Sequence, residues 1–321
     1  MKGIKALSAL ILATSTLFSA TTLADTVKVA VSQIVEHPAL DAARQGLLDG
    51  LNSKGYVEGE NLKFSYQTAQ GNPAIAVQIA KQFVGERPDV LVGIATPTAQ
   101  ALAASTKSIP VVFTAVTDPV GAKLVKQLAQ PGGNVTGLSD LSNVAQHVEL
   151  MQELIPGLKA IGVVYNPGEA NSVALVELLQ DAAKARGVIV VEGTALKTAD
   201  VLSAAQIVAS KSDVIYAPTD NTIASAIEAL VKAGNQAKTP IVGAETSYVQ
   251  KGALAALGFD YYQVGIQTAD YVDAILKGEK PGELDVTVAK GSDLALNQSA
   301  AKKLGITIPV SIVERATSIT E

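Results

Sequence analysis

The sequence lacks cysteine and tryptophan altogether and has only two histidines among its 321 residues. Without cysteine the chain can form no disulfide, no thiolate metal site and no thiol nucleophile. Two histidines leave little room for a zinc site or for several catalytic imidazoles. Basic residues are outnumbered, with 25 Lys and Arg against 30 Asp and Glu. Nucleic-acid-binding domains usually show the opposite balance, so we expect no nucleic-acid partner and no cofactor.

Several catalytic motifs are missing as well. The sequence has no phosphate-binding loop ending in Lys-Ser or Lys-Thr, and no dinucleotide-binding glycine pattern follows the first apolar run. No serine is flanked by glycines at an expected strand-to-helix turn. His37 precedes a proline and His147 lies in a helical pattern, so we expect both to be structural or solvated. These features disfavour an enzyme.

The first 24 residues have the pattern of a secretory signal. Lys2 and Lys5 form a short basic region, residues 6–20 are small or apolar, and Thr22-Leu23-Ala24 offers small residues where a signal peptidase cleaves. The apolar stretch is too short to span a bilayer comfortably. We predict cleavage near Ala24 and location in the periplasm, with an uncleaved N-terminal helix or anchor as the alternative. Without a lipid-anchoring cysteine, the mature chain is expected to diffuse freely.

The rest of the chain alternates short β-branched runs with helical patterns. Most of these runs are apolar without polar alternation, as in strands that are covered on both faces. Alternation of strand and helix predicts parallel sheets with right-handed crossovers, and about ten strands favour two sheets of five to six strands. The runs are Val27–Ser32, Leu62–Tyr66, Val90–Ile94, Val111–Ala115, Val135–Leu138, Ile161–Tyr165, Val188–Val191, Val214–Ala217, Pro240–Val242 and Leu254–Leu257.

We therefore predict an α/β protein with two Rossmann-like lobes. A boundary is expected near Ser139–Asn143, after a Pro-Gly-Gly turn. The helical pattern Tyr262–Lys277 is expected to return to the first lobe, and the C-terminal tail is expected to cross once more. The first lobe then comprises residues 25–139 and 261–285, and the second comprises residues 140–260 and 286–321.

In open parallel sheets, ligands bind beyond the carboxyl ends of the strands. The loops at those ends are therefore where we expect the site. The candidate ligand-binding residues are Ser32, Gln33, Thr96, Pro97, Thr98, Thr114, Ala115, Asp118, Asp220, Asn221, Glu245 and Tyr248.

Thr96-Pro97-Thr98 is the most informative of these loops. Thr96 is a good N-cap residue, and Pro97 suits the first helical position. Free N–H groups at such a helix start favour an anion, so we expect a carboxylate there, also held by the Thr96 and Thr98 hydroxyls. The alternative is that Thr96 only caps its own helix.

Acidic residues follow the strands of the second lobe. Asp220 and Glu245 could accept hydrogen bonds from an ammonium group. The alternatives are that Asp220 caps a helix beginning at Thr222, that Glu245 is a solvated loop acid, and that Asp118 forms a turn. One lobe with an anion receptor and one with a cation receptor could close around a zwitterion.

Several strings, taken together and in order, resemble the periplasmic substrate-binding proteins of ABC transporters, specifically the TrpX-like family. The resemblance covers essentially the whole chain after the signal. The sequence differs from the family in one respect, because it lacks the cysteine that carries the lipid anchor. The strings are His37–Ala42, Thr96–Gln100, Thr117–Gly121, Pro131–Gly137, Pro218–Asn221, Asp260–Tyr262 and Ile275–Pro281.

The resemblance implies the type I periplasmic-binding fold, with three segments crossing between the lobes. It implies import of a small amino acid-like ligand, an aromatic amino acid such as Trp or Phe, through an inner-membrane ABC permease. We expect a monomer that closes by a hinge. A receptor for sugars or other small solutes and a sensor for a membrane kinase are the alternatives. Seven aromatic residues are placed where an apolar slot could form: Phe113, Tyr165, Tyr216, Tyr248, Phe259, Tyr261 and Tyr262.

Overall fold

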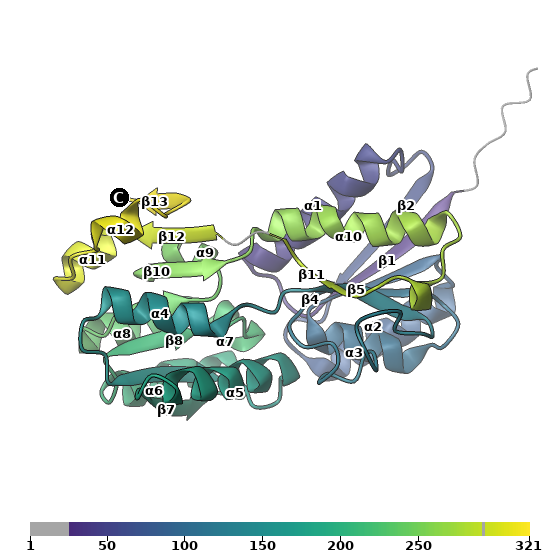
Figure 1. Cartoon of the computed structure of the whole chain (residues 1–321). Helices are drawn as coiled ribbons and strands as arrows, with labels where there is room; N and C mark the ends of the chain where they lie inside the picture. The colour runs from purple at the N-terminus through teal and green to yellow at the C-terminus, as the bar shows by residue number, and fades with distance from the viewer. Residues whose placement is uncertain (1–25, 291–292) are drawn as a thin grey trace, which may run out of the picture.

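The chain folds into two α/β lobes that lie side by side (Figure 1). This computed structural model describes residues 26–290 and 293–321, so the predicted signal at residues 1–24 lies outside the described residues. Each lobe is built on one mainly parallel sheet, which confirms the predicted fold class. No helix in the described ranges is long and apolar enough to cross a membrane.

The first lobe contains a six-stranded parallel sheet with the order β11-β5-β4-β3-β1-β2. Residues of β3, β4 and β5 are buried throughout, which explains their uninterrupted apolar character. The strands are β1 (Val27–Gln33), β2 (Leu62–Thr68), β3 (Val90–Ile94), β4 (Val111–Val116), β5 (Val135–Ser139) and β11 (Thr287–Val288). The helices are α1 (Pro38–Ser53), α2 (Pro73–Glu86), α3 (Thr96–Ser105) and α10 (Tyr261–Leu276), with a 3₁₀ turn η1 (Pro281–Glu283).

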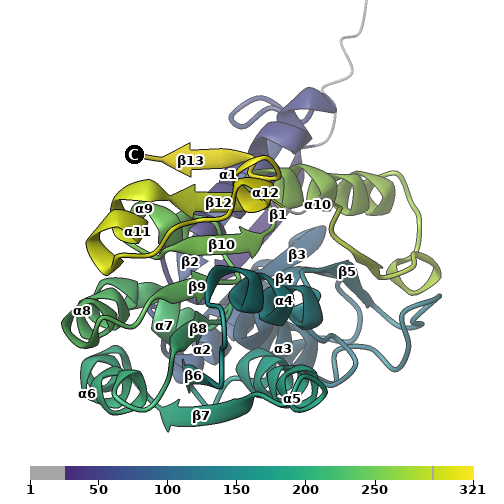
Figure 2. The same cartoon turned by 60° about the vertical axis from the view of Figure 1, so that its left-hand side comes forward.

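The second lobe contains a seven-stranded sheet with the order β13-β12-β10-β9-β8-β6-β7, which can be followed across Figure 2. One pair departs from the predicted parallel arrangement, because β12 runs antiparallel to β10. The strands are β6 (Ala160–Tyr165), β7 (Ile189–Thr194), β8 (Val214–Ala217), β9 (Ile241–Gly243), β10 (Ala255–Gly258), β12 (Asp293–Asn297) and β13 (Ser318–Thr320). The helices are α4 (Val144–Leu154), α5 (Ala170–Lys184), α6 (Thr198–Ala209), α7 (Asn221–Ser225), α8 (Ile227–Ala237), α9 (Ser247–Gln250), α11 (Gln298–Leu304) and α12 (Val310–Val313).

The chain passes from one sheet to the other between β5 and α4, between β10 and α10, and between β11 and β12. The first passage follows Ser139, next to the predicted boundary. The last passage begins later than residue 285, because Thr287 and Val288 still pair with β5 in the first sheet. These strand-end passages place the facing edges of the two lobes around one shared space.

Helix α10 lies alongside α1 in the first lobe, although more than 200 residues separate the two helices in the sequence (Figure 1). The two backbones approach each other at glycines. A Cβ atom on Gly46 would lie 2.0 Å from the Tyr262 carbonyl oxygen, and one on Gly265 would lie 2.1 Å from the Ala43 carbonyl oxygen. Both distances are shorter than any real contact, so only glycine permits this packing.

We predict that Gly265→Ala destabilises the protein by about 2 to 3 kcal/mol, because the new methyl group forces two helix backbones apart. Chemical denaturation measures the free energy of unfolding. Gly85→Ala is the matched control, since Gly85 lies in α2 with open space around it. This control should gain up to about 1 kcal/mol from helix propensity. Equal stability of Gly265→Ala and the native protein would show that the close approach is not needed.

Candidate functional site

A small cavity lies between the lobes. Its walls come from the start of α1, the carboxyl ends of β3, β4, β8 and β9, the first crossing segment, and the starts of α5, α7, α9 and α10. Both lobes therefore contribute to it. The lining residues are His37, Leu40, Ala95, Ala115, Thr117, Asp140, Asn171, Thr219, Asp220, Asn221, Ala224, Glu245, Tyr248 and Tyr261.

Five of the predicted site residues line this cavity, namely Ala115, Asp220, Asn221, Glu245 and Tyr248. The other predicted residues lie outside its lining. Thr98 is turned to the backbone, with its hydroxyl hydrogen-bonded to the Ile94 carbonyl at 2.6 Å. Thr114 is bonded to Thr268 of α10 at 2.8 Å. Pro97 lies in the first turn of α3, and Asp118 forms the expected turn by accepting from the amides of Val120 and Gly121.

Three further predicted residues are buried, and each has one polar side-chain atom without a hydrogen-bond partner. These atoms are Ser32 Oγ and Gln33 Oε1 at the end of β1, and Thr96 Oγ1 at the first residue of α3. None of these atoms has a hydrogen-bond partner among the described residues. Buried polar atoms are almost always paired in native proteins, so an unpaired group marks a place where another molecule can bind.

Two alanines at the cavity have left-handed backbone conformations. Ala95 has φ of +76° and Ala115 has φ of +53°, and both are buried. Ala95 directly follows β3, and Ala115 lies next to the last residue of the neighbouring strand β4. A positive φ costs energy in any residue with a Cβ atom, and such strain clusters at binding sites. The predicted capping role of Thr96 is wrong, because Ala95 occupies the N-cap position and no side chain caps α3.

Asp220 is fully buried and accepts three hydrogen bonds. One carboxylate oxygen accepts from the Ile223 amide at 2.9 Å, which confirms the N-cap role, now for the helix α7. The other accepts from the Asn166 amide at 2.6 Å and the Ser172 hydroxyl at 2.7 Å. Burial raises its pKa to about 7, and the nearby charge of Glu169 adds to that effect. Asp220 therefore both caps the helix and faces the cavity.

Glu169 and Asn171 also belong to this hydrogen-bond network. The sequence analysis did not predict either residue. Glu169 accepts from the backbone amide of Asn221 at 3.2 Å and from the Thr222 hydroxyl at 3.0 Å. Asn171 donates to the Thr219 carbonyl at 3.0 Å, while its Oδ1 atom is buried without a partner. The available signal was their place directly after the loop that follows β6, at the start of α5.

Glu245 and Asp140 add two more buried carboxyl groups. Asp140 accepts from the Tyr261 hydroxyl at 2.7 Å and from the Thr117 hydroxyl at 3.2 Å, and burial raises its pKa. Glu245 accepts from Ser247, and burial raises its pKa to about 7. Glu245 is therefore no solvated loop acid, since its side chain is almost entirely enclosed.

The cavity is acidic as a whole. Within the described part of the chain, Asp140, Asp220 and Glu245 line it, and no Lys or Arg does. Burial lowers the pKa of His37 to about 4, so that ring is uncharged at neutral pH. Carboxylates buried together without a basic partner are unfavourable, and a cation between them relieves the repulsion. The arrangement suits a ligand with a positively charged group.

The seven predicted slot aromatics divide into different environments. Tyr248 and Tyr261 line the cavity. Phe113 and Tyr216 are instead buried in the cores of the first and second lobe. His147 supports this second core, with Nδ1 2.9 Å from the Tyr216 hydroxyl oxygen. Tyr165 is bonded to Glu192 and Tyr262 to Asp49, both away from the cavity, and Phe259 lines a second hollow.

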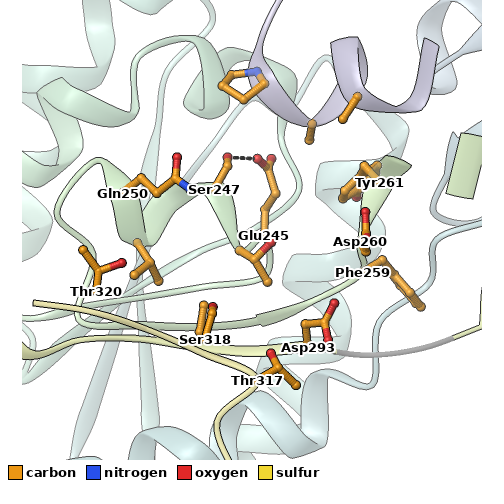
Figure 3. Close-up of a pocket in the computed structure, with 16 residues that line it drawn as sticks. Glu245, Ser247, Gln250, Phe259, Asp260, Tyr261, Asp293, Thr317, Ser318 and Thr320 are labelled. Carbon is orange, nitrogen blue, oxygen red and sulfur yellow. Dashed lines mark hydrogen bonds between the residues drawn. The ribbon is translucent and has the colours of Figure 1, made fainter. Parts of the chain in front are cut away.

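That second hollow is larger than the cavity, and Figure 3 shows the residues that line it. Glu245 and Tyr261 line both spaces, and Figure 3 shows Glu245 bonded to Ser247. Its other labelled residues come from α9, the β10–α10 crossing and the C-terminal strands. In the described ranges, no group of His, Asp and Glu side chains is arranged to hold a metal ion.

A polar cavity between two lobes is the arrangement expected of a solute-binding protein. Residues 28–320 match the family described as ABC transporter substrate binding protein. The chain therefore belongs to this family, which confirms the resemblance seen in the sequence. A relative named "Tyrosine-binding protein" from Clostridioides difficile is 40% identical over 276 residues, or 86% of this chain and 80% of the relative.

Solved structures agree with this assignment. A "conserved domain protein" from Vibrio cholerae is 72% identical, with a TM-score of 0.91 over 92% of this chain and 100% of that chain. An ABC domain from Streptococcus pneumonia in complex with L-Trp is 38% identical, with a TM-score of 0.89 and the same coverage. A ligand-free, open substrate-binding protein from Clostridium difficile is 37% identical, with a TM-score of 0.71 over 92% of this chain and 99% of that chain.

The raised pKa of Glu245 predicts a pH-dependent stability. The folded protein holds this proton up to about pH 7, whereas the unfolded chain releases it near 4.5. Stability from this group is therefore present below the unfolded pKa and is lost as pH rises through the folded pKa. We expect the free energy of unfolding of the ligand-free protein to fall between about pH 5 and about pH 8. Glu245→Gln should flatten part of this fall in chemical denaturation, and equal slopes would contradict it.

Proposed function

We propose that the protein is the periplasmic receptor of an ABC importer and that it binds an amino acid, an aromatic one such as Trp or Phe, in the cavity between its lobes. The observation that carries this proposal is the enclosed acidic cavity, which adjoins a helix start. A zwitterion needs a cation receptor and an anion receptor within a few ångströms. The cavity region offers both, from different lobes.

The ammonium group is assigned to the second-lobe carboxylates. Asp220 and Glu245 line the cavity and lack a cationic side chain there. Each carboxylate oxygen can accept more than one hydrogen bond, so Asp220 can take an ammonium donor in addition to its present partners. A bound ammonium lowers the pKa of both acids and holds them ionised. The charge that is unfavourable in the free protein thus becomes the source of affinity.

The carboxylate group is assigned to the first lobe. The first turn of α3 leaves N–H groups without intrahelical partners, and the positive end of the helix dipole favours an anion. Thr96 Oγ1 and Ser32 Oγ are buried beside it without partners. Ala95 and Ala115 carry only methyl groups, so a ligand can approach their backbone closely. These donors suit a carboxylate better than they suit a neutral sugar.

The side chain of the ligand is assigned to the apolar part of the lining. Tyr248 and Tyr261 present rings, and Leu40 and Ala224 add aliphatic surface. An aromatic side chain packs favourably against such rings, edge-on or offset. The relatives support this class, since one is named for tyrosine and another was solved with L-Trp.

Hinge closure is proposed as the mechanism of binding. This structure matches the L-Trp complex with a TM-score of 0.89 and the open, ligand-free relative with 0.71, at nearly equal identity. Because sequence distance does not account for the gap, the lower TM-score supports a different arrangement of the lobes in the open relative. Because the ligand contacts both lobes only when they are closed, it shifts the population toward the closed state. A membrane permease would then recognise the closed lobes.

The periplasmic location rests on the predicted signal together with membership of the ABC transporter family. A sensor for a membrane kinase would share the fold and the site. A monomer remains our prediction, because each chain carries a complete cavity of its own.

We predict that L-Trp, L-Phe or L-Tyr binds the purified protein, while N-acetylated forms and free sugars do not, because acetylation removes the ammonium charge. Glu245→Gln should weaken binding about thirtyfold or more, as expected for loss of one partner of a buried charge pair. Calorimetry measures both affinities. Asp118→Asn is the matched control, because Asp118 lies outside the cavity and should leave affinity unchanged. Tight sugar binding, or equal affinity for the acetylated ligand, would overturn the assignment.

We also predict that the bound amino acid makes the protein more compact. Small-angle X-ray scattering should show a smaller radius of gyration with the ligand than without it, because the ligand favours the closed lobes. Gly265→Ala is not suited to this comparison, since it alters packing within one lobe. An unchanged scattering curve at saturating ligand would argue against hinge closure.

A further inference from the structure

His37 stands in an unusual position for a helix-capping residue. It occupies the N-cap position of α1 with an extended backbone, at φ −157° and ψ 160°, and Pro38 begins the helix. Its side chain makes no capping hydrogen bond. The backbone and Pro38 therefore start the helix without help from the imidazole, and the ring is available for another task.

The ring of His37 is buried between two spaces. The residue is 8% exposed, and its Nδ1 atom has no hydrogen-bond partner among the described residues. It lines the inner cavity, and it also lines an outer hollow, which we call the vestibule. The vestibule is lined by Glu36, His37, Pro38, Ala224, Ser225, Ile227, Glu228, Glu245, Ser247, Tyr248 and Lys251.

Four residues line both the cavity and the vestibule: His37, Ala224, Glu245 and Tyr248. Three of them belong to the second lobe. Within the described ranges, His37 is the one that the first lobe supplies. The border between the two spaces is thus a contact between the His37 ring and the second lobe.

The ring suits this position because it carries no charge at neutral pH. Burial lowers its pKa to about 4, and the opposing influences of Asp41 and Asn221 are smaller. A neutral aromatic ring can pack against Tyr248 and Ala224 without a charge having to be desolvated. Two of the charged groups of the vestibule, Glu228 and Lys251, are paired with each other at 2.9 Å.

We propose that His37 is the gate of the binding cavity: its ring closes the cavity toward the vestibule, retains the bound amino acid and limits the ligand to a single residue. This inference rests on the proposed function. Because His37 and the opposing residues belong to different lobes, the wall exists only while the lobes are closed. Opening the hinge removes it and frees the route to solvent.

His37→Ala tests the gate. The tightest ligand among L-Trp, L-Phe and L-Tyr serves as the probe, together with its two glycine-containing dipeptides. Stopped-flow displacement should show dissociation about tenfold faster in the variant, with a smaller change in the association rate. Calorimetry should show that the variant gains dipeptide binding, because the cavity then joins the vestibule. A merely structural role would change stability without creating this new ligand range.

Glu36→Ala is the matched control, because Glu36 lines the vestibule but not the cavity. The ligand should dissociate from this variant at the native rate, and the variant should not bind the dipeptides. His37→Phe keeps a ring at the border and should remain slow to dissociate. A folded His37→Ala protein with native dissociation and no dipeptide binding would overturn the gate.

If His37→Ala does not fold, His37→Gln is tested by the same two measurements. We expect faster ligand dissociation from this variant, and dissociation at the native rate would contradict the proposal. Failure of the native protein to bind any of the three amino acids would instead reject the proposed function. The two hypotheses therefore fail in distinguishable ways.

Discussion

Burial of acidic groups without a basic partner is the constraint on which this structure depends. Asp140, Asp220 and Glu245 converge on one enclosed space to which the described residues bring no Lys or Arg. Burial raises the pKa of each carboxyl group, so the ligand-free closed state holds protons that solvent would otherwise take. In the proposed function, the ammonium group of the ligand supplies the missing positive charge, so that affinity and closure share one physical origin.

The parallel sheets explain how residues far apart in sequence reach this space. Carboxyl ends of neighbouring strands meet at one edge of a sheet, and here the edges of both sheets face each other. Ala95 and Ala115 sit at such ends with left-handed backbones, a conformation that the surrounding strands must hold in place. The close packing of α1 against α10 through Gly46 and Gly265 ties the returning chain to the first lobe. In the proposed hinge closure, the crossing segments carry the motion between the lobes.

The strand-end rule predicted the two lobes and placed Ala115, Asp220 and Glu245 at the cavity from sequence alone. It could not predict that Ala95 occupies the N-cap position of α3, because alanine has no preference for a left-handed backbone. It also missed Asp140, which lies in a crossing segment whose path depends on both lobes. The Thr98 hydroxyl donates to the nearby Ile94 carbonyl instead of facing the cavity, and strand position does not determine that direction. Position in the topology was thus readable, whereas side-chain direction was not.

In the proposed function, a ligand between the lobes is retained only while the residues on every side of the cavity stay in place. Two of the three second-lobe residues at the border between the cavity and the vestibule are close together in the chain, with Glu245 in the loop after β9 and Tyr248 in α9. Within the described residues, the first lobe supplies only His37 to the border. If His37 is the gate that we propose, a small relative motion of the lobes opens the cavity without any change inside either lobe.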